Sequence, residues 1–316
     1  MSTSPLMELT DIHKSFGNVN ALRGVSISIN RGECHCLLGD NGAGKSTLIK
    51  IMSGVHQPTA GQVNINGKPT VMQGPREAID SGIATVYQDL ALIPLMSVSR
   101  NFWLGRELTK KIGPITVMDF DKCNSILMSE MEKIGIQLRD PSQSIGTLSG
   151  GERQTVAIAR AVFFGAEILI LDEPTAGVDV ELRANLWTNI NKLNSEGKTI
   201  IITTHYLHEA EELCNEIAIV DNGNLITKDT TSNIKSLIDR KQIIISLDSK
   251  NYNLDPIMGL NVECEINCDY LIINYKPSEI RFNKILDALR LSSIQVKDLT
   301  INETKLEDVF LKLTKN

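Results

Sequence analysis

The first 230 residues show two repeating patterns of apolar positions, one typical of strands and the other of helices. Residues 22–29 alternate, with Val25, Ile27 and Ile29 on one face and serines between them, which predicts a half-buried strand. Further strands are expected at 6–16, 33–38, 61–66, 84–87, 167–171 and 199–204. Helices are expected at 46–53, 120–139, 154–164 and 206–214. Strands that alternate with helices predict an α/β fold.

A hairpin at 216–220 and 224–227 closes this first domain, which we place at 1–235. A second domain is expected at 241–316. Its strands are predicted at 242–247, 261–266, 270–275 and 294–301, and its helices at 278–291 and 304–313. The last helix has a T-x-x-E capping box at Thr304 and Glu307. This order predicts a small ferredoxin-like α+β domain, and because it carries no catalytic constellation we expect a packing or regulatory role.

The composition allows a folded core and argues against a nucleic-acid partner. The chain of 316 residues is 42% hydrophobic, enough for one large α/β domain and a small accessory domain. Its formal net charge is −6 and its pI is near 5.5, whereas a surface that follows phosphates is basic. Neither DNA nor RNA is therefore expected to bind.

Cysteine spacing and hydropathy bear on the compartment. Neither of the near pairs, Cys34 with Cys36 and Cys264 with Cys268, has C-x-x-C spacing, so buried free thiols are expected rather than a metal site. The start of the chain lacks the basic and apolar regions of a secretory signal. The most apolar stretch, 156–171, is broken by charged residues and is too short to span a bilayer. We therefore expect a cytosolic protein that reaches a membrane only through a partner.

The stretch 39–47, GDNGAGKST, fits the phosphate-binding pattern G-x-x-x-x-G-K-[ST]. It lies between the expected strand 33–38 and the expected helix 46–53, which stops before Gly54, so bound phosphates would lie at the positive end of a helix dipole. Lys45 is expected to reach the β- and γ-phosphates, and the Ser46 hydroxyl to bind Mg²⁺. The residues expected to hold the nucleotide here are Gly39, Asp40, Asn41, Gly42, Ala43, Gly44, Lys45, Ser46 and Thr47.

Polar residues follow three of the expected strands. Strand 167–171 runs into Asp172, placed to hold Mg²⁺, and Glu173, placed to accept a proton from the attacking water. Gln88 follows strand 84–87, and its amide could bind Mg²⁺ or the attacking water there. His205 follows strand 199–204, where it could hold the water and Glu173 in place. Considered alone, Gln88 is more typical of a solvated loop and His205 of a core histidine. The expected catalytic residues are Glu173, His205, Lys45 and Gln88, and the expected metal ligands are Ser46, Gln88 and Asp172.

Residues 89–165 predict a helical insertion in the α/β core. The apolar stretch 90–107, with Phe102 and Trp103, is typical either of a docking surface for a partner or of a self-contained helical core. Within the insertion, LSGGERQ at 148–154 forms a second anion-binding nest, with Ser149 as helix N-cap or phosphate ligand. Two nests for one nucleotide mean either that one of them is only a cap, or that the chain dimerises and lends its second nest to the partner's ATP.

In order and spacing, these motifs resemble those of the ATP-binding cassette (ABC) ATPases, which have a P-loop NTPase core. The matching motifs are the phosphate loop, Gln88, LSGGE, ILILDEP, Gly177-Val178-Asp179 and His205, and the resemblance covers residues 6 to about 230. It implies a head-to-tail dimer in which ATP lies between the phosphate loop of one subunit and the LSGGE of the other. The residues that would then act are Ser149, Gly150 and Gly151, in trans on the partner's nucleotide, and Asp179, linking the two sites.

The same resemblance implies that Phe16 stacks on adenine, although its position alone fits an ordinary core phenylalanine equally well. Glu152 stands where many family members have Gln, and we expect little consequence. Within the family, the first part of the chain resembles the ATPases of ribose- and fructose-type sugar importers. From LILDEPTAGVDVELRANLW onward, through TTHYLHEAEELC to LEDVFLKLTKN, it resembles exporters of the ABC-2 type.

The resemblance implies an ATPase subunit that uses ATP and Mg²⁺ to power a separate membrane permease. Its partners would be a second ATPase subunit, an integral membrane permease and, for an importer, a sugar-binding protein. It would lie at the cytoplasmic face of the inner or plasma membrane and drive either monosaccharide import or export through an ABC-2-type permease. A soluble ABC ATPase without a permease is the alternative, but such proteins usually carry two cassettes or long coiled coils. A nucleotide-binding regulator without turnover conflicts with the intact Asp172, Glu173 and His205.

Overall fold

A computed structural model describes residues 4–134, 138–247, 253–267, 270–292, 294, 296–302 and 305–314. It divides the chain into two compact units, Met1–Thr231 and Ser232–Asn316, which we call the N-terminal and C-terminal units. Each unit is described by itself below.

A six-stranded sheet forms the centre of the N-terminal unit. Its spatial order is β12 (Asn224–Thr230), β11 (Glu216–Asp221), β3 (Cys34–Leu38), β10 (Thr199–Thr204), β9 (Ile168–Asp172) and β6 (Ile83–Val86). Five strands are parallel, and β12 closes the edge antiparallel to β11, as the hairpin pattern predicts. The central strands β3 and β10 are buried along their whole length, as expected of strands covered on both faces. Because parallel strands end at one edge, the residues after β3, β9 and β10 come together there.

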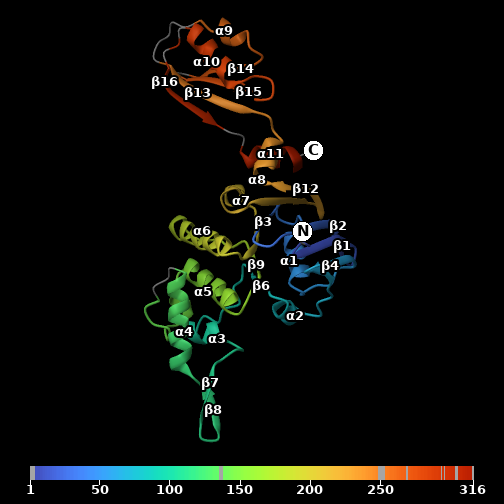
Figure 1. The fold of residues 1–316 in the computed structure, drawn as a ribbon, viewed down its shortest axis with the longest axis vertical. Helices are drawn as coiled ribbons and strands as arrows, with labels where there is room; N and C mark the ends of the chain where they lie inside the picture. The colour runs from blue at the N-terminus through green and yellow to red at the C-terminus, as the bar shows by residue number, and fades with distance from the viewer. Residues whose placement is uncertain are drawn as a thin grey trace. The chain divides into compact units, whose positions relative to one another are not determined.

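A second, antiparallel sheet and two helices cover one face of the six-stranded sheet (Figure 1). The sheet has the order β2 (Val19–Ile29), β1 (Met7–Phe16), β4 (Ala60–Ile65) and β5 (Lys68–Pro69). The helices are α1 (Lys45–Met52) and α2 (Pro75–Asp80). As the pattern predicts, α1 stops before Gly54, which has a φ of 72°. Buried side chains from both sheets and both helices form one apolar cluster, which holds the start of α1 rigidly behind the loop 39–44.

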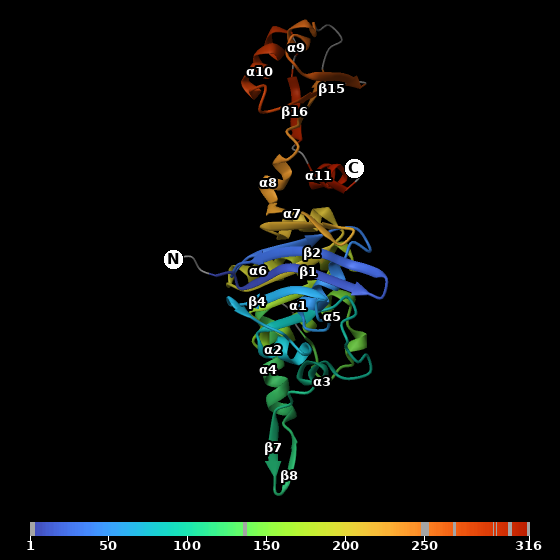
Figure 2. The same ribbon diagram turned by 90° about the vertical axis from the view of Figure 1, so that its right-hand side faces the viewer.

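The opposite side of the N-terminal unit is helical (Figures 1 and 2). It comprises α3 (Val98–Trp103), α4 (Phe120–Lys133), the short 3₁₀ helix η1 (Ile145–Thr147), α5 (Gly150–Phe163), α6 (Val180–Ser195) and α7 (Leu207–Leu213). Phe102 and Trp103 are fully buried against α4 and α5, so the docking-surface interpretation of these two side chains is wrong and the self-contained helical core is right. The pattern did not predict α2, α3 or α6, and it placed the end of α4 too late and the start of α5 too late.

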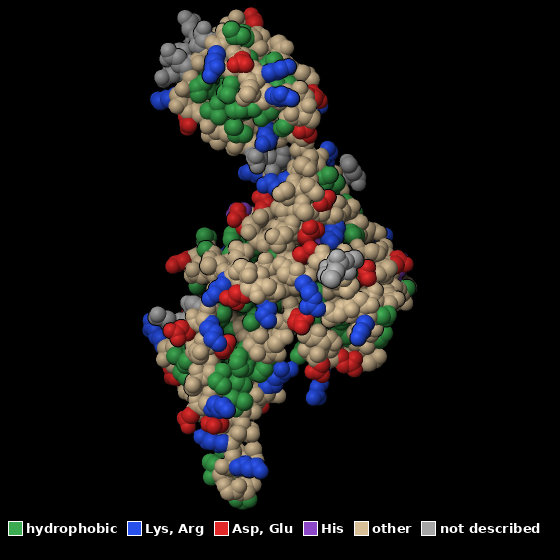
Figure 3. Space-filling view, in the orientation of Figure 1, with side chains coloured by type: hydrophobic (Ala, Val, Ile, Leu, Met, Phe, Trp, Pro, Cys, Tyr) green, Lys and Arg blue, Asp and Glu red, His purple; other side chains and the backbone are tan. Residues whose placement is uncertain are grey.

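A hairpin that the sequence reading missed projects from the helical part. Its strands β7 (Thr109–Ile112) and β8 (Ile115–Met118) pair only with each other among the described residues. Ile112 and Ile115 are exposed at its tip, where Figure 3 shows hydrophobic side chains beside basic ones. The short turn Gly113-Pro114 explains the hairpin, because proline and a glycine with a φ of 60° favour a tight reversal.

In the described part of the chain, no helix has both the length and the apolar character needed to cross a bilayer.

The C-terminal unit begins with α8 (Thr231–Ser236), whose first residue still belongs to the N-terminal unit. It then follows the order β13 (Lys241–Leu247), α9 (Asp255–Met258), β14 (Glu263–Asn267), β15 (Tyr270–Tyr275), α10 (Phe282–Leu291), β16 (Val296–Asn302) and α11 (Leu306–Thr314). The β-α-β-β-α-β order, with an antiparallel sheet β14-β15-β13-β16, is ferredoxin-like, as predicted, although the helix α9 was not among the predicted elements. The capping box predicted at Thr304 lies outside the described residues.

Candidate functional site

The loop 39–44 between β3 and α1 encloses the amino group of Lys45. The Lys45 side chain is buried, and its Nζ donates hydrogen bonds to the carbonyl oxygens of Gly39 at 2.6 Å and Asp40 at 3.1 Å. Burial lowers the pKa of Lys45, while the carboxylates of Glu173 and Asp172 act in the opposite direction. The cation is therefore held at the base of the loop, ready to exchange neutral carbonyl partners for a more strongly charged acceptor.

Two glycines give the loop its shape. Gly42 and Gly44 have φ angles of 86° and 110°, a region that residues with a side chain rarely adopt. A Cβ on Gly44 would also lie 2.9 Å from the carbonyl oxygen of Ala21. The β11–β12 hairpin supports the loop from outside, since the Gly223 amide donates to the Ala43 carbonyl at 2.9 Å. The backbone is thus built for close approach of a ligand to its amides.

The start of α1 opens onto a cavity of about 280 Å³. Its lining includes residues of the loop, the β2 segment and the β11–β12 turn: Val19, Asn20, Ala21, Arg23, Asn41, Gly42, Gly44, Lys45, Ser46, Thr47, Glu173, Asn222 and Gly223. No side chain of the described residues caps α1, so the first amides of the helix face a ligand without competition. Exposed amides, a helix dipole and the Lys45 ammonium fit the phosphates of a nucleotide.

Asp172 and Glu173 are placed by Thr203 on the neighbouring strand. The Thr203 hydroxyl donates to Asp172 Oδ1 at 2.6 Å and accepts from the Glu173 amide at 3.1 Å. Glu173 has a φ of 47°, a left-handed conformation that a non-glycine residue adopts only when its surroundings hold it there. This sharp bend after β9 turns the Glu173 side chain into the cavity beside Lys45 and Ser46. The sequence reading missed Thr203, although the pair Thr203-Thr204 at the end of an otherwise aliphatic strand was a signal.

His205 faces the carboxylate of Glu173. Its Nδ1 lies 3.3 Å from Glu173 Oε1, and the two side chains are 35% and 18% exposed. The core-histidine interpretation is therefore wrong, because His205 reaches solvent and is partnered by an acid. The imidazole also stacks on Tyr206, with ring centroids 4.1 Å apart. His205 is thus oriented from two sides, which suits a group that must hold a carboxylate and a water in a fixed relation.

Gln88 and Phe16 lie outside this immediate cluster. Gln88 is exposed, two residues beyond the end of β6, and is not among the described residues that line the cavity. Phe16, at the end of β1, is 44% exposed, so it is not a core phenylalanine. Its ring packs edge-on against His56, and Lys14 Nζ lies 5.0 Å from its centroid. Phe16 is paired with Val19, which lines the cavity, so a partly exposed ring at this place can stack on a base.

The second nest stands at the start of α5, where Ser149 is the N-cap as predicted. Its hydroxyl accepts from the Glu152 amide at 3.2 Å, and Glu152 Oε2 in turn accepts from the Ser149 amide, which completes a capping box. Gly150 is exposed with open space around its Cα, whereas a Cβ on Gly151 would lie 2.9 Å from Leu182 Cβ. Asp179 caps α6 by accepting from the Leu182 amide at 2.9 Å. These residues do not line the cavity at the phosphate loop of their own chain.

The donor set at the phosphate loop fits Mg²⁺ as well as a nucleotide. Magnesium is typically held by one or two carboxylates and a hydroxyl, with phosphate oxygens completing its shell. Ser46 has an exposed hydroxyl at the start of α1, and Asp172 ends β9 with one oxygen held by Thr203. Oxygen donors without a histidine or cysteine ligand match this hard cation.

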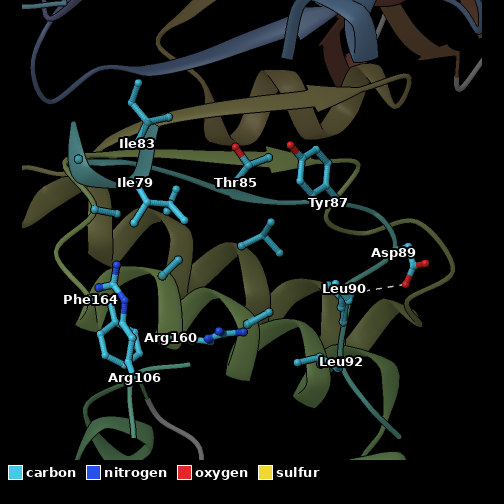
Figure 4. A pocket seen from close by; sticks show the side chains of 17 residues that line it. Ile79, Ile83, Thr85, Tyr87, Asp89, Leu90, Leu92, Arg106, Arg160 and Phe164 are labelled. Carbon is cyan, nitrogen blue, oxygen red and sulfur yellow. Dashed lines mark hydrogen bonds between the residues drawn. The ribbon is translucent and has the colours of Figure 1, made fainter. Parts of the chain in front are cut away.

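A second cavity of about 280 Å³ lies between β6, the segment after it and α5 (Figure 4). Most of its lining is apolar, including Ile79, Leu92 and Phe164, while the guanidinium groups of Arg106 and Arg160 lie along one side of it. Arg160 donates to the Leu104 carbonyl, and Arg106 stacks over Phe164. Tyr87 and Asp89 both line this cavity, so it borders the segment that carries Gln88.

Comparison with known proteins agrees with these motifs. Residues 22–176 match the family described as ABC transporter. The chain is 42% identical over 223 residues to the xylose/arabinose import ATP-binding protein of Sulfolobus acidocaldarius, covering 71% of this chain and 87% of that protein. It is 40% identical over 226 residues to a ribose import ATP-binding protein of Streptomyces avermitilis, covering 72% of this chain but only 44% of that longer protein.

Solved structures give the same fold. The N-terminal unit is similar to an ATP-binding cassette of an ABC transporter in its ADP conformation, with a TM-score of 0.64 and 27% identity over 73% of this chain and 93% of that one. A bacterial ABC transporter cassette described as dimeric matches with a TM-score of 0.61 and 27% identity over 71% of this chain and 98% of that one.

Proposed function

This chain belongs to the ABC transporter ATP-binding proteins, which hydrolyse ATP to power transport, and we propose that it is the ATPase subunit of a monosaccharide importer. The observation that supports the ATPase role is that Lys45 and Glu173 line one cavity at the phosphate loop, where His205 contacts the Glu173 carboxylate. Both relatives named above are described as sugar import proteins. That favours import over the ABC-2-type export suggested by the second half of the sequence.

In this proposal the loop 39–47 binds the triphosphate. Its amides and the amides at the start of α1 donate to phosphate oxygens, and Lys45 exchanges the Gly39 and Asp40 carbonyls for the β- and γ-phosphates. Phe16 offers its exposed ring face to the adenine. The buried lysine needs no rearrangement of the loop to reach a ligand, so the site is largely preformed.

Ser46, Asp172 and Gln88 would hold Mg²⁺, which neutralises developing charge on the phosphates when it is bound. Of these residues, Ser46 lies in the first turn of α1 and Asp172 ends β9, whereas Gln88 must approach from the segment after β6. Thr203 keeps the Asp172 carboxylate in place through its hydroxyl.

Glu173 is the proposed general base and His205 its positioning residue. The carboxylate takes a proton from water as the water attacks the γ-phosphate, while His205 Nδ1, 3.3 Å from Glu173 Oε1, holds the carboxylate at one angle. The strained backbone of Glu173 supports this assignment, because strain of about 1–3 kcal/mol is usually retained only where function requires the geometry. Phosphoryl transfer asks mainly for such positioning and charge stabilisation.

We place the second half of each ATP site in a partner subunit. Ser149, Gly150 and Gly151 lie at a helix start, exposed at Gly150, that does not border the chain's own phosphate loop, so a head-to-tail dimer gives them a ligand. Asp179, the N-cap of α6, bonds the Leu182 amide, and the Leu182 side chain packs against Gly151, so Asp179 would link the two sites. Dimeric structure is described for one of the similar cassettes.

The membrane permease would dock at the second cavity. Its apolar lining can bury an apolar side chain of the permease, and Arg106 and Arg160 can pair with a carboxylate or a helix C-terminus beside it. Gln88 stands between Tyr87 and Asp89 of this cavity, so a ligand at the metal site and a segment in the cavity would act on the same short stretch. The chain would then work at the cytoplasmic face of the inner or plasma membrane, with a sugar-binding protein on the other side.

Affinity purification of the chain from gently solubilised membranes of its host tests the partner assignment. We expect a permease accompanied by a sugar-binding protein. A six-span ABC-2-type permease without a binding protein would replace import by export, and recovery without any membrane protein would favour the soluble class.

A single variant tests the assignment of the base. Glu173→Gln keeps the size of the side chain and its reach to His205, so ATP binding is retained while phosphate release slows by about 10²–10⁴-fold. Lys45→Ala, as the matched comparison, loses ATP binding itself. Wild-type turnover in Glu173→Gln would show that another group is the base.

A further inference from the structure

The Ser149 hydroxyl is already used inside its own chain. It donates to Glu152 Oε2 at 2.8 Å, and the same carboxylate oxygen accepts from the Ser149 amide at 2.8 Å. The Ser149 oxygen meanwhile accepts from the Glu152 amide at 3.2 Å. A hydrogen bond to a carboxylate is stronger than one to a neutral acceptor, so Glu152 holds the Ser149 hydroxyl strongly.

A phosphate arriving from a partner subunit competes with Glu152 for that proton. A hydroxyl carries a single O–H, so while it points at Glu152 it can offer the phosphate only lone pairs. The Glu152 carboxylate also places a negative charge in the first turn of α5, the end of the helix that otherwise attracts an anion. Both effects oppose the approach of a second anion to Ser149 and Gly150.

We propose that Glu152 is a positioning residue that sets how tightly the start of α5 accepts the partner's nucleotide, and this rests on the proposed head-to-tail dimer. With Glu152 ionised, the Ser149 hydroxyl must leave the carboxylate before it donates to a γ-phosphate oxygen. Glu152 therefore raises the ATP concentration at which two subunits close around the nucleotide. This proposal differs from the expectation of little consequence that the sequence alone gave for Glu152.

Glu152→Gln separates this effect from helix capping. Glutamine also completes a capping box, because its amide oxygen can accept from the Ser149 amide. The variant thus keeps the cap geometry but loses the charge, so its melting temperature should fall only slightly below that of wild type. The neutral acceptor holds the Ser149 hydroxyl less strongly, which favours transfer of the hydrogen bond to phosphate by about fivefold.

The experiment measures ATP-dependent dimer formation of the full chain by sedimentation velocity. Glu173→Gln serves as background, so that ATP persists during the measurement. Adding Glu152→Gln should lower the half-maximal ATP concentration about fivefold. In the hydrolysing chain, the same change should lower KM for ATP by a similar factor and leave kcat within about twofold. Asp121→Asn, which removes an acid from the first turn of α4, is the matched control and should change neither value.

Three outcomes would overturn part of this reasoning, and they are distinguishable. If Glu173→Gln forms no dimer at any ATP concentration, the head-to-tail dimer of the proposed function is wrong. If it dimerises and Glu152→Gln leaves the ATP dependence unchanged, only the role of Glu152 is wrong. Ser149→Ala provides the third comparison, because without the hydroxyl Glu152→Gln should have much less effect. An equal effect with and without the hydroxyl would mean that charge alone acts, and would overturn the positioning role.

Discussion

His35 makes the stability of the N-terminal unit depend on pH in a way that can be calculated. It is the second residue of β3 and is fully buried, on the face of the sheet shared with Leu37 and with Ile201 of β10. Neither ring nitrogen has a hydrogen-bond partner among the described residues. Burial, together with the charge of Lys228, lowers the pKa of His35 from 6.5 to about 3. The ring is therefore neutral in the folded protein at any pH the cell would offer.

The sign of the pH effect follows from this depressed pKa. Between pH 6.5 and about 3, the unfolded chain binds a proton at residue 35 that the folded chain does not, so acid favours unfolding. The contribution of neutral His35 to the free energy of unfolding is fully present above pH 6.5 and decreases by about 1.4 kcal/mol for each pH unit below it. At pH 5 the loss is about 2 kcal/mol, which is a substantial part of a typical folding free energy of about 5–15 kcal/mol.

The variant His35→Met removes this titration and fills the site with an apolar side chain of similar size. We expect its free energy of unfolding at pH 8 to equal or exceed that of wild type, because two unpaired buried nitrogens disappear. Between pH 8 and pH 5, wild type should lose about 2 kcal/mol more than the variant. The assay is urea unfolding at pH 8, 7, 6 and 5, followed by the fluorescence of Trp103 and Trp187, the only two tryptophans of the chain.

Other acids and histidines titrate equally in both proteins and cancel in this difference. Parallel pH profiles for wild type and His35→Met would refute the reasoning. They would mean that the folded protein takes up the proton at His35 as readily as the unfolded chain does.

The remaining predictions concern two buried polar side chains. Thr203→Val keeps the shape of the side chain but removes the hydroxyl that joins Asp172 to the Glu173 amide. The rate of phosphate release should therefore fall by about 10–100-fold at low Mg²⁺. An unchanged dependence of this rate on Mg²⁺ would show that Thr203 does not support the site. Asn101 bonds through both amide atoms to the backbone of residues 93–97, with its Oδ1 2.8 Å from the Ile93 amide. Asn101→Ala should lower the free energy of unfolding by about 2–3 kcal/mol in urea titration, and a loss below 0.5 kcal/mol would contradict that role.

Several parts of this protein could be predicted because their signals are local. The loop from Gly39 to Thr47 has a sequence that few other structures require, since Gly42 and Gly44 adopt positive φ angles and Lys45 follows them at the spacing of a phosphate-binding loop. The strand 167–171 and the acids after it were also readable, because an aliphatic run that ends in two carboxylates has few other uses. The C-terminal order of strands and helix was visible in the apolar pattern as well.

Other parts depended on contacts that no local pattern contains. In sequence Trp103 fits either a docking surface or a helical core, and the structure decides for the core because α4 and α5 pack over it. The helix α6 was missed because its apolar stripe, with Leu186 and Ile190, is short and interrupted by polar residues, and its stability comes from packing on its neighbours. The hairpin β7–β8 was missed because its strands are only four residues long.

The amino-acid sequence by itself determined the phosphate loop, the order of the motifs and the class of chemistry, because each of these is carried by residue types at fixed spacing. The tertiary structure decided which side chains meet. Thr203 reaches Asp172 and Glu173 only because β10 lies beside β9, and Glu173 faces His205 only because its backbone is bent into a positive φ. Distances of about 3 Å between residues 30 positions apart are set by strand order and packing, which are properties of the whole domain.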